Sequence, residues 1–178
     1  MKPSRKLLSS VIFFSMSSHL VQAATDINIS NQANSDITLS TPFVDATNNG
    51  GTSNLQVVTL VGALGSSNVL VSTASAGLNP LEGKLEVKDS IAWNSNRTLS
   101  LNADSNIVIG ATITSLGGGG SLNLTAVSTV AFDADVTLLG AAANLTVTSG
   151  GISQASGRKL LVDGLADLNG GEIGRAHV

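Results

Sequence analysis

The 178-residue chain contains no cysteine and no tyrosine, and aromatic residues make up only 3% of it. The absence of cysteine excludes disulfide bonds as a source of stability. Aromatic side chains usually supply much of the core of a compact enzyme, so their scarcity argues against a core of that kind. Charged residues account for 12%, against roughly a quarter in ordinary globular domains. Stability must therefore come from the aliphatic and small polar residues that dominate the composition.

Histidine occurs at only two positions, His19 and His177, close to the two ends of the chain. The stretch between them therefore contains neither a Ser-His-Asp triad nor a Cys-His nucleophile, and it lacks the His and Cys ligands of most zinc sites. We expect no catalytic residue, no metal site and no bound cofactor. Basic residues are few and scattered there, so we also expect no nucleic-acid partner. Between residues 24 and 171 they are Lys84, Lys88, Arg97, Arg158 and Lys159.

Residues 1–23 are typical of a secretory signal peptide. Three basic residues precede the apolar stretch 7–16, and Val21 and Ala23 provide small side chains for cleavage before Ala24. The alternative is a membrane anchor, but the apolar stretch is far shorter than the roughly 20 residues that span a bilayer. We therefore predict that residues 1–23 are removed and that the protein is secreted or held at the cell surface.

A repeat of about 23 residues organises the middle of the chain. Leu99, Leu122 and Leu145 belong to three closely related stretches, and each is followed two positions later by a second apolar residue. Another apolar series, which includes Ile107 and Val130, keeps the same spacing. A fixed period in the low twenties indicates a solenoid. The three stretches are TLSLNA at 98–103, SLNLTA at 121–126 and NLTVTS at 144–149.

Apolar and polar residues alternate within each repeat, which is the pattern of a β-strand with one buried face. Short strands stacked at a fixed repeat describe an all-β fold of the β-helix or β-solenoid class. We predict coils of about 23 residues over residues 66–171, with about three strands in each coil. Residues 24–65 are expected to form a strand-rich lead-in or cap.

Within the lead-in, the alternating stretches 26–30 and 36–40 predict strands, whereas residues 54–60 fit either a strand or a short helical cap. Residues 68–72 predict another strand, and the stretch GLNPLEG at 77–83 predicts an inserted loop. The coil that begins at Lys84 is offset by one residue, because Leu85 and Val87 lie one position away from where the 23-residue spacing would place them.

The repeat loosens after residue 149, although apolar residues still predict short strands up to residue 171. The last seven residues, EIGRAHV at 172–178, break the pattern and resemble the translation of a common sequencing adapter. We expect this segment to be foreign and the natural chain to continue beyond residue 171. A genuine polar C-terminus is the alternative. The late apolar residues are Ile152, Leu160, Val162, Leu165 and Leu168.

The segment SIAWNSNRTLSLNADSNIVIGATITSLGGGGSLNLTA, residues 90–126, resembles the coils of filamentous-haemagglutinin-type exoproteins. The resemblance extends over residues 66–171 and is carried by Ile91-Ala92-Trp93, Leu99-x-Leu101-x-Ala103 and Ile107-x-Ile109 in combination. It implies a right-handed parallel β-helix in a very large secreted or surface-bound bacterial adhesin, haemagglutinin or toxin carrier. It also implies a host-cell or surface receptor or glycan as partner. For export it implies an outer-membrane secretion partner or a fused barrel domain.

The chain departs from this family in one respect. Exoproteins of the two-partner secretion class begin with a domain that carries Asn-Pro-Asn-type motifs, and residues 25–60 contain none. The only Asn-Pro pair is Asn79-Pro80, within the expected loop. The resemblance therefore leaves the secretion route open.

Carboxylates are the remaining candidates for chemistry. Asp133 and Asp135 lie two positions apart, so they would point to the same face if both lay on a strand. Paired carboxylates are the standard apparatus of glycosidases, and some parallel β-helix enzymes use groups of aspartates on one face. The simpler interpretation is a solvated pair at a strand end, and we favour it because no other group converges on them.

Three further motifs favour structural roles. Trp93 alternates with Ile91, which predicts an interior or corner position in the coil and not a sugar-stacking surface. The four glycines at 117–120 are followed by no aspartate, so they predict a turn and not a calcium-binding repeat. Asn-x-Ser/Thr triplets carry little weight, because alternation of polar and apolar residues produces them automatically. They begin at Asn28, Asn96, Asn123 and Asn144.

These observations predict a structural or adhesive β-helical segment of a large secreted or surface-exposed exoprotein, without enzymatic activity. Two alternatives stay open. One is a carbohydrate-active β-helix enzyme that uses Asp133 and Asp135. The other is the stalk of a contact-dependent toxin or autotransporter passenger whose active part lies beyond residue 171.

Overall fold

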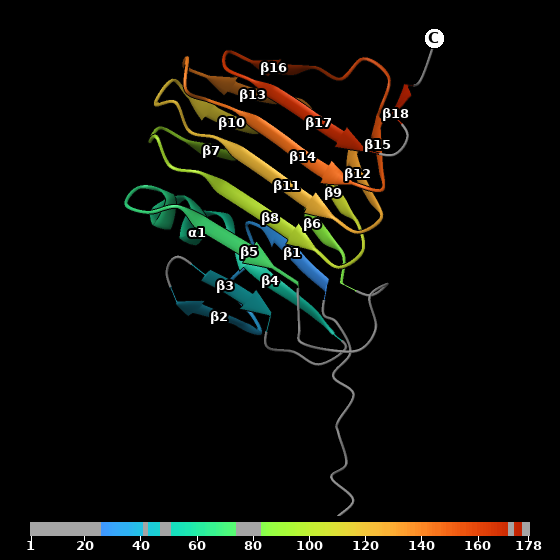
Figure 1. Ribbon diagram of the computed structural model, residues 1–178. Coiled ribbons are helices and arrows are strands. Elements are labelled where there is room, and N and C mark those ends of the chain that lie inside the picture. The colour runs from blue at the N-terminus through green and yellow to red at the C-terminus, as the bar shows by residue number, and fades with distance from the viewer. Residues whose placement is uncertain (1–25, 41–42, 47–50, 74–82, 171–172, 176–178) are drawn as a thin grey trace, which may run out of the picture.

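The computed structural model describes residues 26–40, 43–46, 51–73, 83–170 and 173–175. Over these residues the chain winds into a β-solenoid with three sheets of stacked strands (Figure 1). The predicted fold class, an all-β solenoid with a repeat of about 23 residues, is confirmed. The predicted signal peptide and most of the predicted loop at 77–83 lie outside the described residues.

We call the three sheets A, B and C. Each regular coil contributes one strand to sheet A, then one to sheet C, then one to sheet B. In that order, the first regular coil contains β6 (Leu85–Val87), β7 (Ile91–Trp93) and β8 (Leu99–Ala103). The second contains β9 (Ile107–Ile109), β10 (Ile113–Leu116) and β11 (Leu122–Ala126). The third contains β12 (Thr129–Phe132), β13 (Val136–Leu139) and β14 (Leu145–Ser149). The fourth contains β15 (Gly151–Gln154), β16 (Leu160–Val162) and β17 (Ala166–Gly170).

The register between coils follows the sequence repeat. In sheet B, Leu99, Leu122 and Leu145 lie side by side on neighbouring strands, each one full repeat after the last. In sheet A, Leu85 pairs with Ile107, so the predicted offset of one residue is confirmed. Sheet C keeps the same offset between these two coils, because Ile91 pairs with Ile113. The additional residue is therefore accommodated in the turn between sheet C and sheet B.

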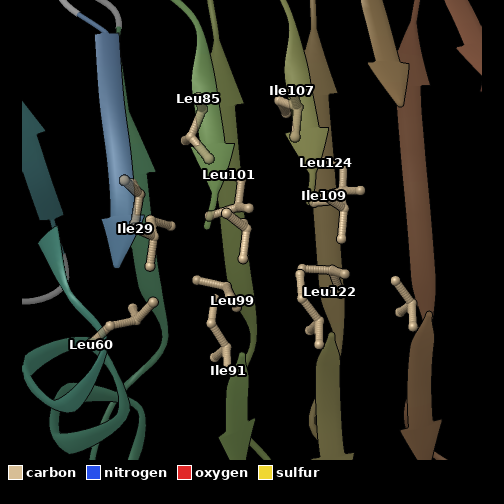
Figure 2. Packing of buried hydrophobic residues seen from close by; sticks show 14 of the residues in the cluster. Ile29, Leu60, Leu85, Ile91, Leu99, Leu101, Ile107, Ile109, Leu122 and Leu124 are labelled. Atoms are coloured by element: carbon tan, nitrogen blue, oxygen red, sulfur yellow. The ribbon is translucent and has the colours of Figure 1, made fainter. Parts of the chain in front are cut away.

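The interior of the solenoid is a stack of aliphatic side chains. Alternate residues of each strand point inward, as Leu99 and Leu122 of sheet B and Ile107 of sheet A do in Figure 2. These three side chains have no exposed surface. Burying a side chain of this size stabilises the folded state by about 1.5–3 kcal/mol. Repetition of such residues along the axis builds a core without the aromatics that the sequence lacks.

The coil before β6 contains a helix in place of the sheet C strand. It runs through β4 (Thr52–Gln56), α1 (Val57–Leu64) and β5 (Val69–Ser72). The sequence allowed a strand or a helix for residues 54–60. In the structure these residues contain the end of strand β4 and the beginning of helix α1. Leu60 and Leu64 of α1 are buried at helical spacing. The hydroxyl of Ser95, in the next coil, donates a hydrogen bond of 2.6 Å to the Leu64 carbonyl. This hydrogen bond connects the C-terminal end of α1 to the next coil.

Strand β1 (Asp26–Ser30), which the sequence predicted, is inserted between two coils. It pairs in parallel with β4 on one side and with β6 on the other. Ile27 and Ile29 are fully buried. The Asp26 carboxylate accepts a 2.8 Å hydrogen bond from the Lys84 backbone N–H. The N-terminal strand is therefore an integral part of sheet A.

A hairpin lies at the lower end of sheet B (Figure 1). It consists of β2 (Ile37–Ser40) and β3 (Phe43–Ala46), which pair antiparallel, and β3 lies beside β5. The predicted strand at 36–40 begins one residue later than expected. Asp36 adopts a positive φ of 52°, a left-handed conformation that does not continue a strand.

The predicted short strands after residue 149 are present as β15, β16 and β17. Leu165 is the exception, since it lies outside a strand and is exposed. Within the tail, β18 (Ile173–Arg175) pairs in parallel with β15. The foreign origin of residues 172–178 stays a prediction.

Candidate functional site

Asp133 and Asp135 lie in the turn between β12 and β13, and not on a strand as the catalytic hypothesis required. Asp133 is exposed, and Ala134 between them is buried. The Asp135 carboxylate accepts a 3.0 Å hydrogen bond from the backbone N–H of Lys159 in the coil above. Asp135 therefore helps to join two neighbouring coils. This hydrogen bond does not bring Asp133 and Asp135 together in one site.

The hydrogen bond of Asp135 belongs to a wider pattern at the turns. At the corner before sheet B, Asn68 accepts a bond of 3.0 Å from the Thr98 N–H, and Ser121 accepts one of 3.1 Å from the Asn144 N–H. Asn144 in turn accepts a bond of 2.8 Å from the Leu165 N–H. Backbone N–H groups that strands leave unpaired at the corners are thus satisfied by side chains of the coil below.

This corner pattern was missed in the sequence, although a signal for it exists. Ser121 and Asn144 lie one full repeat apart, and each immediately precedes the first apolar residue of a sheet B strand. A polar residue that repeats with the period of the coil, and not with the period of the strand, indicates such a series of hydrogen bonds between successive corners. We call this series the corner ladder.

Trp93 is buried, with 2% of its surface exposed, as predicted. Its indole N–H donates a hydrogen bond of 3.1 Å to the Arg97 carbonyl. This contact spans the turn after sheet C and satisfies the only polar atom of the side chain. Trp93 therefore has no free face on which a sugar could stack.

The four-glycine segment at 117–120 is a turn, as predicted, and the backbone explains its composition. Gly117 and Gly119 have φ angles of 92° and 80°, which residues with a side chain rarely adopt. Gly120 packs directly against the Trp93 indole and lies where a Cβ atom would be 2.6 Å from the Ser95 carbonyl oxygen. The turn thus requires glycine for two separate reasons, conformation and space.

In the described part of the chain, Ser115 is the one residue whose buried side chain lacks a hydrogen-bond partner. Sequence patterns did not single it out. It pairs with Trp93 on one side and with Leu138 on the other, so its hydroxyl points into the apolar stack. A buried hydroxyl without a partner costs about 1–3 kcal/mol. Nothing else in the described interior brings a second reactive group to Ser115.

The carboxyl group of Asp104 has a shifted pKa. Burial in the turn between β8 and β9 raises the pKa of its carboxyl group above the ordinary value of 3.8. Its backbone N–H donates a 3.0 Å hydrogen bond to the hydroxyl of Thr73, which is itself buried. Asp104 stands apart from Asp133 and Asp135, which lie in a different turn of a different coil.

The four Asn-x-Ser/Thr triplets lie in different settings. Asn96 is exposed in the turn between β7 and β8, whereas Asn28 and Asn123 are half-buried on strands. Asn144 lies at the corner before β14, with its side chain engaged in the corner ladder.

The broadest regular surface is the outer face of sheet B. Its strands β8, β11, β14 and β17 are five residues long, whereas the strands of the same coils in sheets A and C have three or four. Hydroxyl, amide and carboxylate side chains form two columns across these strands, in the registers given by the strand pairing. The columns are Ser100, Asn123, Thr146 and Asp167, and Asn102, Thr125, Thr148 and Asn169.

The acidic residues of the described chain are dispersed over its coils. Among the residues that the structure describes, no three His, Cys, Asp or Glu residues are grouped so that they could hold a metal ion. Helix α1 has eight residues, and the described part of the chain contains no helix of the length and apolar character that crossing a bilayer requires.

Comparison with known protein families, with curated proteins and with solved structures finds no match to this chain.

Proposed function

We propose that the chain is a structural and adhesive module of an exported bacterial exoprotein. In this role it acts as a rigid spacer, carries a binding face along its side and catalyses no reaction. The observation that supports the spacer most directly is the unbroken parallel pairing of four coils in all three sheets, around a continuous aliphatic interior. Such a rod resists bending because each coil is bonded to its neighbours along its whole circumference.

The outer face of sheet B is the surface that we propose for adhesion. Neighbouring strands lie about 4.8 Å apart, and successive outward residues of a strand about 7 Å apart, so the two columns form a flat lattice of polar groups. Hydroxyl and amide groups can both donate and accept hydrogen bonds. The columns between Ser100 and Asn169 contain no Lys or Arg. These features favour a glycan that is neutral over an acidic one.

Binding to neutral glycans tests this proposal. The purified chain is applied to a glycan array and to cultured cells, beside a variant with Thr125→Arg and Thr148→Arg. Both threonines are exposed on the proposed face, and the two long side chains would disrupt its flatness. The matched control is Thr114→Arg with Thr137→Arg, which makes the same changes on the outer face of sheet C.

We expect the sheet B variant to lose at least about tenfold in affinity, which corresponds to roughly 1.4 kcal/mol. The control variant is expected to bind like the wild type, and circular dichroism should show the same β content for all three proteins. Equal binding by the wild type and the sheet B variant, or no binding to any glycan, would refute the adhesive role.

A further inference from the structure

The inference concerns the triplet Asn96-Arg97-Thr98, which differs from the other three Asn-x-Ser/Thr triplets in its middle residue. The middle residues of the others are Ile29, Leu124 and Leu145, and these side chains are buried. Such triplets arise from the alternation of polar and apolar residues in strands. Arg97, by contrast, is charged and exposed, and it lies in the turn between β7 and β8. Strand alternation therefore does not account for this triplet.

The reactive groups of this triplet are free in a well-defined turn. Asn96 is exposed, and its carboxamide forms no hydrogen bond with another described residue. Thr98 is half-buried, and its hydroxyl is likewise unbonded within the described chain. The backbone around them is fixed, because the Arg97 carbonyl accepts the Trp93 indole N–H and the Thr98 N–H donates to the Asn68 side chain. The turn thus holds an accessible asparagine close to an accessible hydroxyl.

The neighbouring turns leave room for a large group beside Asn96. The turn above, at 117–120, consists of four glycines and has no side chain that could cover it. It packs closely on the backbone, since a Cβ at Gly120 would lie 2.9 Å from the Arg97 carbonyl oxygen. The end of α1 lies below, where Ser95 donates its hydrogen bond to the Leu64 carbonyl. The next four residues there, 65–68, are Gly-Ser-Ser-Asn, which are all small.

The other three triplets are held by the sheets. Asn28 lies on β1 between β4 and β6, and the hydroxyl of Ser30 is buried and donates a bond of 2.7 Å to Asn54. Asn123 lies on β11, which is paired on both sides. The Asn144 side chain accepts the Leu165 N–H, and the rest of its triplet belongs to β14, which is also paired on both sides. Access to these triplets would require a strand to leave its sheet.

We propose that Asn96 is the position at which the folded chain accepts an N-linked glycan. An Asn-x-Ser/Thr triplet in a surface turn is the form in which such acceptors occur. The donor is a sugar carried on a phosphate leaving group, either a lipid pyrophosphate or a nucleoside diphosphate. The Asn96 Nδ2 forms a bond to the anomeric carbon, and the bond from that carbon to the phosphate oxygen breaks. The phosphate leaves with the electron pair, and the amide proton passes to a base of the transferase.

Glycosylation of the folded chain in solution tests the proposal. The full 178-residue chain is made in a host without asparagine glycosylation and is then incubated with a transferase and its donor. One arm uses a soluble asparagine glycosyltransferase with a nucleotide-activated hexose. The other uses a membrane oligosaccharyltransferase with a lipid-pyrophosphate oligosaccharide. Each transferase is chosen because it modifies four short peptides, one for each triplet. Mass spectrometry of the intact chain and of its peptides counts and locates the sugars.

We expect one sugar per folded chain, attached to Asn96, in at least one arm, and the arm that succeeds identifies the class of donor. The initial rate at Asn96 should exceed the rates at Asn28, Asn123 and Asn144 by at least about tenfold. A tenfold difference corresponds to about 1.4 kcal/mol of local opening at the paired strands. The short peptides, which have no sheet to open, should show no such preference.

Substitutions separate the acceptor from its surroundings. Asn96→Gln and Thr98→Val should abolish the modification, whereas Thr98→Ser keeps a hydroxyl and should retain it. The matched control Asn123→Gln removes a triplet from β11 and should leave the modification unchanged. Since the side chains of Asn96 and Thr98 form no hydrogen bonds within the described chain, their variants should keep the wild-type melting temperature. A folded chain that neither transferase modifies, or one modified at Asn123 as fast as at Asn96, would overturn the proposal.

Discussion

At the residue scale, the fold depends on a few positions where a turn or the interior tolerates one kind of side chain. The turn after sheet C shows this clearly, because the Trp93 indole and the backbone around Ser95 occupy the space where a side chain at Gly120 would lie. The same scale contains two places where burial is unfavourable, namely the Ser115 hydroxyl and the Asp104 carboxyl.

Substitution of Gly120 by alanine is expected to destabilise the protein by about 2 kcal/mol or more, because the added Cβ meets the backbone and the Trp93 ring. The control is Gly62→Ala in α1, where a Cβ would meet nothing within 4 Å. That change should stabilise the protein by about 0.5–1 kcal/mol, since alanine favours helix. Urea denaturation measures both, and equal effects would show that the turn is packed differently.

Replacement of Ser115 by alanine removes a buried hydroxyl without a partner, so it should raise the free energy of unfolding by about 1 kcal/mol. Ser153→Ala, on the exposed face of sheet A, serves as the comparison and should change it little. Thermal unfolding by circular dichroism gives both values. A lower melting temperature for the Ser115 variant would indicate that its hydroxyl is hydrogen-bonded.

The raised pKa of Asp104 predicts a dependence of stability on pH. Because its pKa is higher in the folded state, the protonated carboxyl contributes stability that is fully present below pH 3.8. That contribution is lost as the pH rises through the folded pKa. Asp104→Asn should therefore be more stable than the wild type at pH 7, with a smaller difference near pH 3. A difference that grows on acidification would contradict the assigned cause.

At the scale of the elements, alternation and period together predicted most of the regular coils. The apolar pairs of β8, β11 and β14 specify both the inward faces and the register, because a shift by one residue would expose each pair. The place of β1 between β4 and β6 could not be predicted in this way. That pairing joins residues far apart in sequence, and no repeat relates β1 to its neighbours.

The candidate chemistry was harder to place from sequence than the strands. Asp133 and Asp135 have the spacing of one strand face, but the chain turns at Ala134, whose side chain is buried at the corner. Trp93 was placed correctly because its alternation with Ile91 is a property of the strand itself. Alternation therefore places a side chain correctly within a strand, and it misplaces Asp133 and Asp135 because the chain turns between them.

An inward leucine of sheet B provides the test at this scale. Leu122→Asp would bury a carboxylate between Leu99 and Leu145, and it should cost several kcal/mol of stability. Asn123→Asp adds the same charge on the outer face and is expected to cost less than about 0.5 kcal/mol. Retention of the wild-type melting temperature by the Leu122 variant would show that this residue does not point inward.

At the scale of the whole molecule, the described chain is a rod built from coils that repeat along one axis. Backbone pairing, aliphatic columns and corner hydrogen bonds all connect each coil to the next, so stability is distributed along the rod and not concentrated in one core. A rod of this kind suits a spacer with a binding face along its side, as proposed above.

The stacking of successive coils is the central claim, and disulfide formation between introduced cysteines tests it most directly, because the natural chain has none. Asn123→Cys with Thr146→Cys places two cysteines on paired residues of β11 and β14. Their Cα atoms should lie about 4.8 Å apart, within the range of a disulfide. Asn123→Cys with Asp167→Cys separates them by two strands, or about 10 Å, which is too far. Stacked coils predict that mild oxidation closes an intramolecular disulfide in the first variant and not in the second. Equal closure in both variants, or closure only in the second, would contradict the solenoid.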